Sequence, residues 1–198
     1  MSRDDERERE NESGDGSEGA VREAFPAIDR IADDDLRAGV VDAWTTALDE
    51  TGWTLAEAPW SPPVQDALDL PDERLVDHVN DVVAGAEALA DRLGERRPAA
   101  VSRDLLLAAA LVHDLGKLYE FDRDGRTRVH DLFGHPYYGI VPAAQAGLPP
   151  EVVHVVLSHT SLTGAEPATL EAELVRRADE AAGAAIRAGA VEDLRDAP

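Results

Sequence analysis

The chain has 198 residues, enough for one domain or for one domain with an appendage. Its net charge of −22 argues against a strongly basic clamp for nucleic acid, and its lack of cysteine excludes disulfide scaffolds, thiolate zinc sites and cysteine nucleophiles. Hydrophobic residues make up 43%, so a packed core is expected. No apolar run approaches the ~20 residues of a bilayer span, and the charged start MSRDDERERE is unlike a signal peptide. We therefore expect a cytoplasmic protein without a membrane partner.

The first 71 residues divide into two predicted segments. Residues 1–20 are polar and carry a net charge of −5, which predicts a disordered acidic tail. Residues 21–71 are predicted to form a helical N-terminal extension that ends in a proline-rich connector. Apolar residues recur at helical spacing in Asp34–Thr51, and the four prolines in Pro59–Pro71 favour an extended path.

Residues 72–198 are predicted to form one helical domain. Apolar positions recur with helical periodicity from Asp72 onward, and His78 lies at the border of that apolar face. Ser102–Tyr119 is apolar nearly all round, so we expect it to be the buried central helix, capped by Ser102.

Three further segments complete the predicted architecture. Further helices are expected to begin at Pro149-Pro150 and after Thr169. The Asp-Gly pair within Phe121–Val129 favours either a short hairpin or a loop. The predicted fold class is therefore all-α, a helical bundle with at most one short hairpin near 121–129.

Histidines and aspartates lie on or beside these predicted helices in an order typical of a metal site: His78, His113-Asp114, His135, His159 and Asp179. Neutral imidazoles and carboxylates suit Zn, Fe and Mn and, with more oxygen ligands, Mg. A carboxylate can bridge two ions, whereas an imidazole cannot do so without losing its second proton.

Four segments carry a resemblance to a known family: HDLGKLYEF at 113–121, LFGHPYYG at 132–139, VLSHTS at 156–161 and RRADE at 176–180. The order His, His-Asp, Asp resembles the HD superfamily of metal-dependent phosphohydrolases. The four segments are similar in order and spacing to HD-type 3′-5′ exoribonucleases, over roughly Asp72–Ile186. The resemblance implies an all-helical HD-domain bundle that hydrolyses a phosphoester of a nucleotide or nucleic acid.

The resemblance also implies which residues bind metal. One divalent ion would be held by His78, His113, Asp114 and Asp179. A second would be held by His135 and His159, with Asp114 as the bridge. The cofactor is thus expected to be one or two divalent ions, drawn from Mn, Fe, Ni, Zn, Co or Mg.

Asp114 and Lys117 are the predicted catalytic residues. Lys117 is the only lysine in a chain with 18 arginines, and it lies in the HDxGK segment, where we expect it to contact the substrate phosphate. His130 and His154 match no ligand position and are predicted not to bind metal.

Two more residues are candidates for substrate binding. Tyr137 follows the Gly-His-Pro sequence and could stack on a base, although a packing role is equally compatible. Arg126, with its neighbours Arg123 and Arg128, could contact phosphates or could simply be a solvated loop arginine. Both possibilities remain open at this point.

Three functions are compatible with these residues. The first is a phosphohydrolase that uses metal-activated water on a nucleotide or phosphodiester. The second is a 3′-5′ exoribonuclease, with RNA as the partner, but Thr160 and Ser161 stand where that family usually has a second His and a Gly. Residues 21–70 are also too short and too helical for its oligonucleotide-binding barrel. The third is a non-catalytic sensor that binds metal and nucleotide. The oligomeric state is left open.

Acidic composition and an arginine bias resemble proteins of salt-loving organisms, which leads to a first prediction. Like-charge repulsion is screened over ~3 Å in molar salt but over ~10 Å at 0.1 M. We expect the free energy of unfolding, measured by denaturant titration, to fall as KCl is lowered from molar to ~0.1 M. Full stability at 0.1 M would contradict a halophilic adaptation.

Overall fold

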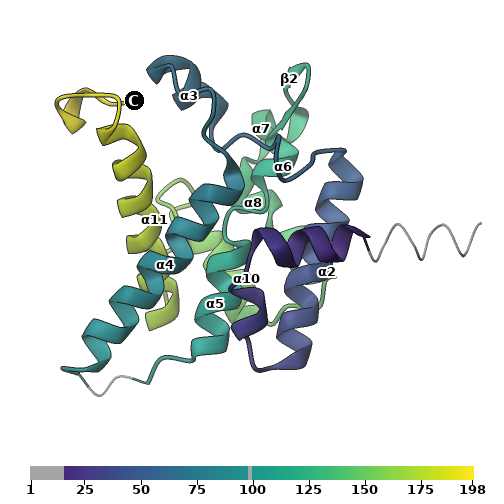
Figure 1. Ribbon diagram of the computed structural model, residues 1–198, viewed down its shortest axis with the longest axis vertical. Helices are drawn as coiled ribbons and strands as arrows, with labels where there is room; N and C mark the ends of the chain where they lie inside the picture. The colour runs from purple at the N-terminus through teal and green to yellow at the C-terminus, as the bar shows by residue number, and fades with distance from the viewer. Residues whose placement is uncertain (1–15, 98–99) are drawn as a thin grey trace, which may run out of the picture.

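The computed structural model describes residues 16–97 and 100–198 as a helical bundle with one two-stranded hairpin (Figure 1). This confirms the predicted fold class. The elements are η1 (Ile28–Arg30), α2 (Asp34–Thr51), α3 (Pro62–Leu68), α4 (Leu75–Gly94), α5 (Arg103–Val112), α6 (Lys117–Glu120), β1 (Phe121–Asp122), β2 (Gly125–Arg126), α7 (Arg128–Leu132), α8 (His135–Tyr138), α9 (Ile140–Gln145), α10 (Pro150–Ser158), α11 (Leu170–Ala188) and η2 (Leu194–Asp196).

Helix α5 forms the centre of the bundle. It contacts α2, α4, α10 and α11, and its residues from Leu106 to Val112 are all buried. The Ser102 hydroxyl accepts a hydrogen bond from the backbone N–H of Leu105, as the predicted N-cap requires. Helices α4 and α11 lie side by side along one flank of α5 (Figure 1). The apolar pattern therefore correctly predicted a buried central helix that begins after Ser102.

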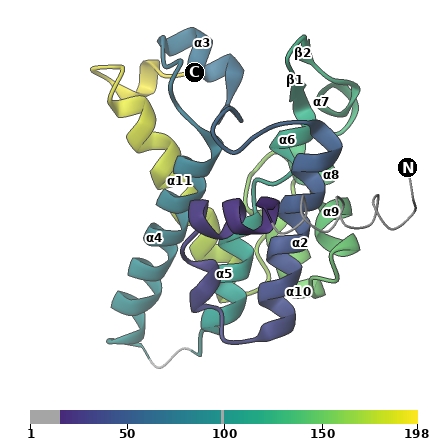
Figure 2. The ribbon, with the colours of Figure 1, turned by 45° about the vertical axis from the view of Figure 1, so that its right-hand side comes forward.

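The N-terminal extension is part of the same core. Phe25, Ile28 and Trp44 are fully buried, and the Trp44 indole N–H donates a hydrogen bond to the Leu111 carbonyl of α5 (3.0 Å). Figure 2 shows α2 beside α5. Residues 16–24 are helical, so the helix includes 16–20, which the sequence assigned to the acidic tail. The rest of that predicted tail, 1–15, lies outside the described residues.

The proline-rich connector differs from its predicted extended form because it contains α3, which starts at Pro62-Pro63. Proline suits the first positions of a helix, where its missing N–H costs no hydrogen bond. Before α3, the chain pairs with the segment that leads into α4. The N–H of Trp60 donates to the Glu73 carbonyl (3.3 Å), and the N–H of Leu75 donates to the Ala58 carbonyl (3.0 Å). These bonds fix Trp60 beside the start of α4.

The predicted helix Ser102–Tyr119 is divided in the structure. Helix α5 ends at Val112, a turn covers 113–116, and α6 begins at Lys117. Within the turn the Lys117 N–H donates to the Asp114 carbonyl (2.9 Å). Gly116, the last residue of the turn, packs directly on the backbone at the start of α8, where a side chain would not fit. The hairpin that follows pairs Phe121 with Arg126.

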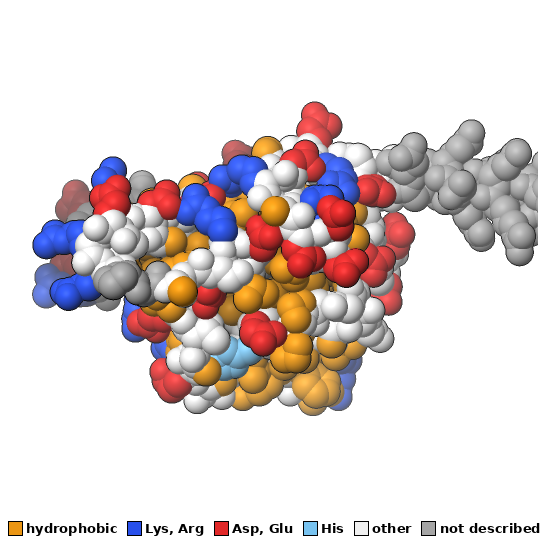
Figure 3. All heavy atoms as spheres, turned by 90° about the horizontal axis from the view of Figure 1, so that it is seen from below, with side chains coloured by type: hydrophobic (Ala, Val, Ile, Leu, Met, Phe, Trp, Pro, Cys, Tyr) orange, Lys and Arg blue, Asp and Glu red, His pale blue; other side chains and the backbone are white. Residues whose placement is uncertain are grey.

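The surface carries the acidic excess. Figure 3 shows one face, on which Asp and Glu side chains are spread among hydrophobic and basic ones and not gathered into one cluster. Among residues 16–97 and 100–198, no helix combines the length and hydrophobicity that a bilayer crossing requires.

The contact between α2 and α5 gives a stability prediction. Trp44→Ala removes a fully buried ring that packs on Phe25, with ring centroids 4.6 Å apart, and also the hydrogen bond to Leu111. We expect the free energy of unfolding to fall by about 3–5 kcal/mol. The control is Leu132→Ala, which removes a side chain with 59% exposure and should change stability by no more than about 0.5 kcal/mol. Equal effects of the two variants in denaturant titration would contradict this account.

Candidate metal centre

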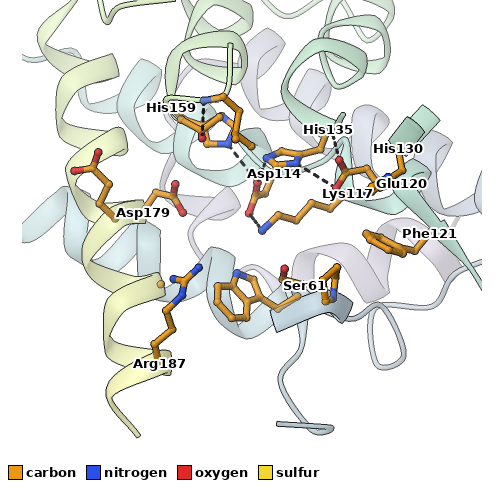
Figure 4. Close-up of a pocket in the computed structure, with 16 residues that line it drawn as sticks. Ser61, Asp114, Lys117, Glu120, Phe121, His130, His135, His159, Asp179 and Arg187 are labelled. Atoms are coloured by element: carbon orange, nitrogen blue, oxygen red, sulfur yellow. Dashed lines mark hydrogen bonds and ion pairs between the residues drawn. The ribbon is translucent and has the colours of Figure 1, made fainter. Parts of the chain in front are cut away.

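Five helices or helix ends bring the predicted ligands together around the turn after α5. His78 lies in the first turn of α4 and Asp179 in the middle of α11. The C-cap positions of α5 and α10 supply His113 and His159, and α8 begins with His135. Figure 4 shows Asp114 between His159 and His135, with Asp179 facing it from α11. Residues distant in sequence therefore meet at one carboxylate.

The two oxygens of Asp114 face different pairs of imidazoles. Its Oδ2 lies 3.3 Å from Nε2 of His78 and 3.4 Å from Nε2 of His113. Its Oδ1 lies 3.3 Å from Nε2 of His135 and 3.4 Å from Nε2 of His159. Asp114 is 1% exposed, so this carboxylate is held by its neighbours and not by water. It is placed as a bridge between two groups of ligand atoms.

Asp179 completes the first group. Its Oδ1 lies 3.0 Å from Nε2 of His78 and 3.8 Å from Nε2 of His113. In each group, the ligand atoms lie within 4.8 Å of one another, as the shell of one ion requires. The groups are His78, His113, Asp114 and Asp179, and then Asp114, His135 and His159. Nε2 of His113 is buried and has no hydrogen-bond partner among the described residues, which fits an atom reserved for a ligand. The donor set thus fits divalent metal ions.

The backbone orients two of the imidazoles in the same way. Nδ1 of His113 lies 2.7 Å from the Ala110 carbonyl, and Nδ1 of His159 lies 2.8 Å from the Val156 carbonyl. A carbonyl only accepts hydrogen bonds, so each Nδ1 carries the proton and each Nε2 keeps its lone pair. Both Nε2 lone pairs then face Asp114. The tautomer with its proton on Nδ1 is the one that can bind a metal through Nε2.

Glu120 orients the imidazole of His135 by accepting a hydrogen bond from its Nδ1. This residue was not among those predicted from the sequence. It accepts hydrogen bonds from the backbone N–H of His135 (2.7 Å) and from its Nδ1 (3.2 Å). Glu120 is 8% exposed at the end of α6. The signal was available in the sequence, because an acid that follows Lys117 by three residues lies on the same helical face. Its partner in the next segment could not be read from the sequence.

The charges of the centre hold its carboxylates ionised. Burial favours a raised pKa for Asp114, but the positive charge of Lys117 and the neighbouring His113 side chain outweigh it and keep that pKa well below its usual range. Burial acts in the same sense on Asp179, where the hydrogen bond to His78 lowers the pKa to about 2. Burial also lowers the pKa of His135, which favours the neutral imidazole that binds metal. The two ionised carboxylates and the neutral His135 imidazole are the forms that bind metal at neutral pH.

Lys117 lies beside the bridging carboxylate, with Nζ 2.7 Å from Oδ2 of Asp114. The same ammonium lies 5.4 Å from the centroid of the Trp60 ring. This arrangement places the only lysine of the chain at the metal centre, where the sequence predicted it. It also involves Trp60, a residue of the connector that the sequence did not single out.

A pocket of about 390 Å³ opens over the centre. Its lining includes five of the predicted site residues: Asp114, Lys117, His135, His159 and Asp179. Sequence reasoning missed several other lining residues: Trp60, Ser61, Pro63, Glu120, Phe121, Leu162, Glu180, Gly183 and Arg187. Trp60, Ser61 and Pro63 come from the connector, whereas Gly183 and Arg187 follow the RRADE segment on α11.

Two predicted substrate-binding residues do not line this pocket. Tyr137 is 46% exposed, and its hydroxyl donates to the Thr163 carbonyl (2.8 Å), so it ties α8 to the following loop. Arg126 is exposed on β2. Of the two histidines predicted not to bind metal, His130 lines the pocket against the Phe121 ring at 5.1 Å, outside both ligand groups. His154 accepts a hydrogen bond from the Ala168 N–H away from the centre.

Fold and ligand geometry together define a helical metal-binding domain of known type. The chain belongs to the HD-domain family, whose model matches residues 75–183. Over 164 residues it is 30% identical to the dihydroneopterin 2′,3′-cyclic phosphate phosphodiesterase of Methanocaldococcus jannaschii. That alignment covers 77% of this chain and 65% of the relative, so the chain spans less than two thirds of the relative's length. No solved structure is significantly similar.

These comparisons refine the resemblance that the sequence motifs carry. The HD assignment is confirmed. The relative is a cyclic phosphate phosphodiesterase and not an exoribonuclease, to which the motifs were likened above. The match to the family leaves out Trp60 and Arg187, which lie on either side of 75–183 and line the pocket nevertheless.

Close packing at Gly116 gives a prediction about how the centre is assembled. A Cβ on Gly116 would overlap the His135 carbonyl oxygen and lie 3.0 Å from Cα of Gly139. Gly116→Ala should therefore displace His135 from Asp114 and lower the metal bound per chain, measured by elemental analysis, as His135→Ala should. The control Gly94→Ala introduces a Cβ with nothing within 4 Å and should keep the wild-type metal content. One ion per chain in wild type, unchanged in His135→Ala, would contradict a second metal site.

Proposed function

We propose that the protein is a metal-dependent phosphodiesterase that hydrolyses a small, nucleotide-like phosphodiester such as a cyclic phosphate. The observation that carries the proposal is the position of Asp114. Its two oxygens face two separate ligand groups, as a carboxylate that bridges two ions must. When bound there, two divalent ions would supply an activated water and neutralise charge on the phosphate oxygens.

The protein's own residues have distinct parts in this proposal. His78, His113 and Asp179 would hold one ion, His135 and His159 would hold the other, and Asp114 would be shared. Glu120 keeps the His135 ring in place through its hydrogen bond to Nδ1. The Lys117 ammonium is held by Asp114 at the pocket surface, where it can donate a hydrogen bond to a phosphate oxygen.

The shape of the pocket supports a small substrate. Its volume of about 390 Å³ is at the lower end of the range for small-molecule sites. Figure 4 shows Phe121 and His130 at one side of Lys117, and Arg187 and Asp179 at the other. The Phe121 and His130 rings meet edge to face, with an interplanar angle of 62°, and provide aromatic contacts suited to a heterocycle, while the phosphate would lie toward Asp114. The activity named for the Methanocaldococcus relative, on a pterin cyclic phosphate, supports the same substrate class.

The alternatives make different predictions in one assay. An exoribonuclease would degrade labelled single-stranded RNA from its 3′ end in preference to cyclic phosphates. A sensor would bind metal and nucleotide without turnover. Mn²⁺, Fe²⁺ and Ni²⁺ should each be tested in molar KCl, with bis-p-nitrophenyl phosphate, 2′,3′-cyclic nucleotides and RNA as substrates.

We expect release of p-nitrophenol and opening of the 2′,3′-cyclic phosphates. Asp114→Asn should lower kcat/KM by at least about 100-fold, because even residues that only orient metal ligands are worth 10- to 100-fold. The control is Asp81→Asn, the same change at an exposed position of α4, which should retain wild-type activity. No turnover of any substrate by fully metal-loaded protein would exclude the enzyme, and preferential RNA degradation would favour the exoribonuclease.

A further inference from the structure

We propose that Arg187 binds the substrate phosphate and that Trp60 and Gly183 position its guanidinium, so that this part of the pocket sets phosphate affinity. The inference rests on the proposed phosphodiesterase function and extends it to residues outside the family match. It assigns the anion-binding role to a side chain on α11, in addition to Lys117.

Arg187 differs in its pairing from the other arginines of α11. Arg176 pairs with Glu166, and Arg177 pairs with Glu173 and Glu180. Nε of Arg187 donates to the backbone oxygen of Pro198 (3.0 Å), but no Asp or Glu side chain in the described chain pairs with its guanidinium. In a protein of net charge −22, a half-buried arginine without an Asp or Glu partner keeps the two Nη groups of its guanidinium available to an external anion.

The guanidinium is held over the pocket by two neighbours. Its Cζ lies 5.3 Å from the centroid of the Trp60 ring. A Cβ on Gly183, one helical turn earlier, would lie 2.9 Å from Nη1 of Arg187 and 3.6 Å from Cζ2 of Trp60. The absence of a side chain at Gly183 therefore provides the space in which the arginine head lies. Figure 4 shows the guanidinium of Arg187 directed into the pocket.

One indole ring contacts both cations of the pocket. The Trp60 ring lies 5.4 Å from Nζ of Lys117 and packs against the His78 imidazole, with centroids 5.4 Å apart. Trp60 is 4% exposed, and its Nε1–H is buried without an acceptor among the described residues. The same ring therefore joins the ligand His78 to the two cations that face the pocket.

Lys117 and Arg187 differ in how far their positive charges are already compensated. Lys117 is already 2.7 Å from Asp114, so much of its charge is compensated by that carboxylate. Arg187 has no Asp or Glu partner in the described chain, and the two Nη groups of its planar guanidinium can donate two hydrogen bonds to the oxygens of a phosphate. Arg187 is therefore the residue of this pocket with the greater unused capacity for an anion.

The test compares Arg187→Gln, Arg187→Lys and Gly183→Ala with wild type, all loaded with metal. Two readouts are used: calorimetric affinity for inorganic phosphate, and KM and kcat for a 2′,3′-cyclic nucleotide. Arg187→Gln should weaken phosphate binding and raise KM by about 10- to 100-fold, the worth of a hydrogen bond to a charged group. Arg187→Lys should recover part of the loss, because it restores the charge without the planar fork.

Gly183→Ala separates this role from a merely structural one. It keeps every charge and should raise the melting temperature, because alanine favours a helix over glycine. It should nevertheless weaken phosphate binding, since the new Cβ displaces the guanidinium. The matched control is Arg177→Gln, which removes an arginine of α11 that does not line the pocket and should leave both readouts unchanged.

Two results would overturn the inference. One is wild-type phosphate affinity and KM in Arg187→Gln, and the other is an equal loss in Arg177→Gln. Loss of bound metal in Arg187→Gln, measured in the same samples, would also count against it, because the effect would then pass through the metal ligands. If wild type turns over no substrate, the proposed function fails. The phosphate affinities of wild type and Arg187→Gln still show whether Arg187 binds phosphate.

Discussion

The structure depends on one buried carboxylate. Asp114 is 1% exposed, and an ionised carboxylate without compensation would be strongly unfavourable in that position. Its compensation comes from imidazoles on four different helices or helix ends and from Lys117 in its own turn. Each of those groups must be delivered by a correctly packed element. The contacts that stabilise the buried Asp114 carboxylate therefore also shape the cavity. The site requires the packed bundle, and the bundle requires the groups that compensate this charge.

Much of this could be predicted from the sequence, because the relevant signals are local. Asp34–Thr51 has the same bounds as α2, since its apolar spacing, the N-cap Asp33 and the C-terminal Gly52 are all neighbours along the chain. The histidine and aspartate ligands were likewise named from short motifs, and the structure brings all six together. The prediction of one helix over Ser102–Tyr119 was wrong because the chain turns at 113–116, where Gly116 packs against α8 from a later part of the chain, a contact that the local pattern does not reveal.

The rest of the pocket was beyond sequence reasoning for the same physical reason. Trp60 and Arg187 lie in separate segments, and only the packing of the connector and the end of α11 brings them into contact. Tyr137 and Arg126 were chosen because they are near the histidine motifs in sequence. Closeness along the chain does not determine the direction of a side chain, and Tyr137 bonds to the loop at Thr163 while Arg126 lies on the exposed hairpin.

The pairing of the connector with the start of α4 has an evolutionary consequence. The candidate metal ligands lie within the region that the family model matches, whereas Trp60 comes from the connector before it. The backbone bonds from Trp60 to Glu73 and from Leu75 to Ala58 anchor the connector at the rim of the cavity. Variation in the connector can thus alter the rim while the ligand set stays intact. Such an arrangement allows descendants of one ancestral metal centre to diverge in the molecules they accept without rebuilding their chemistry.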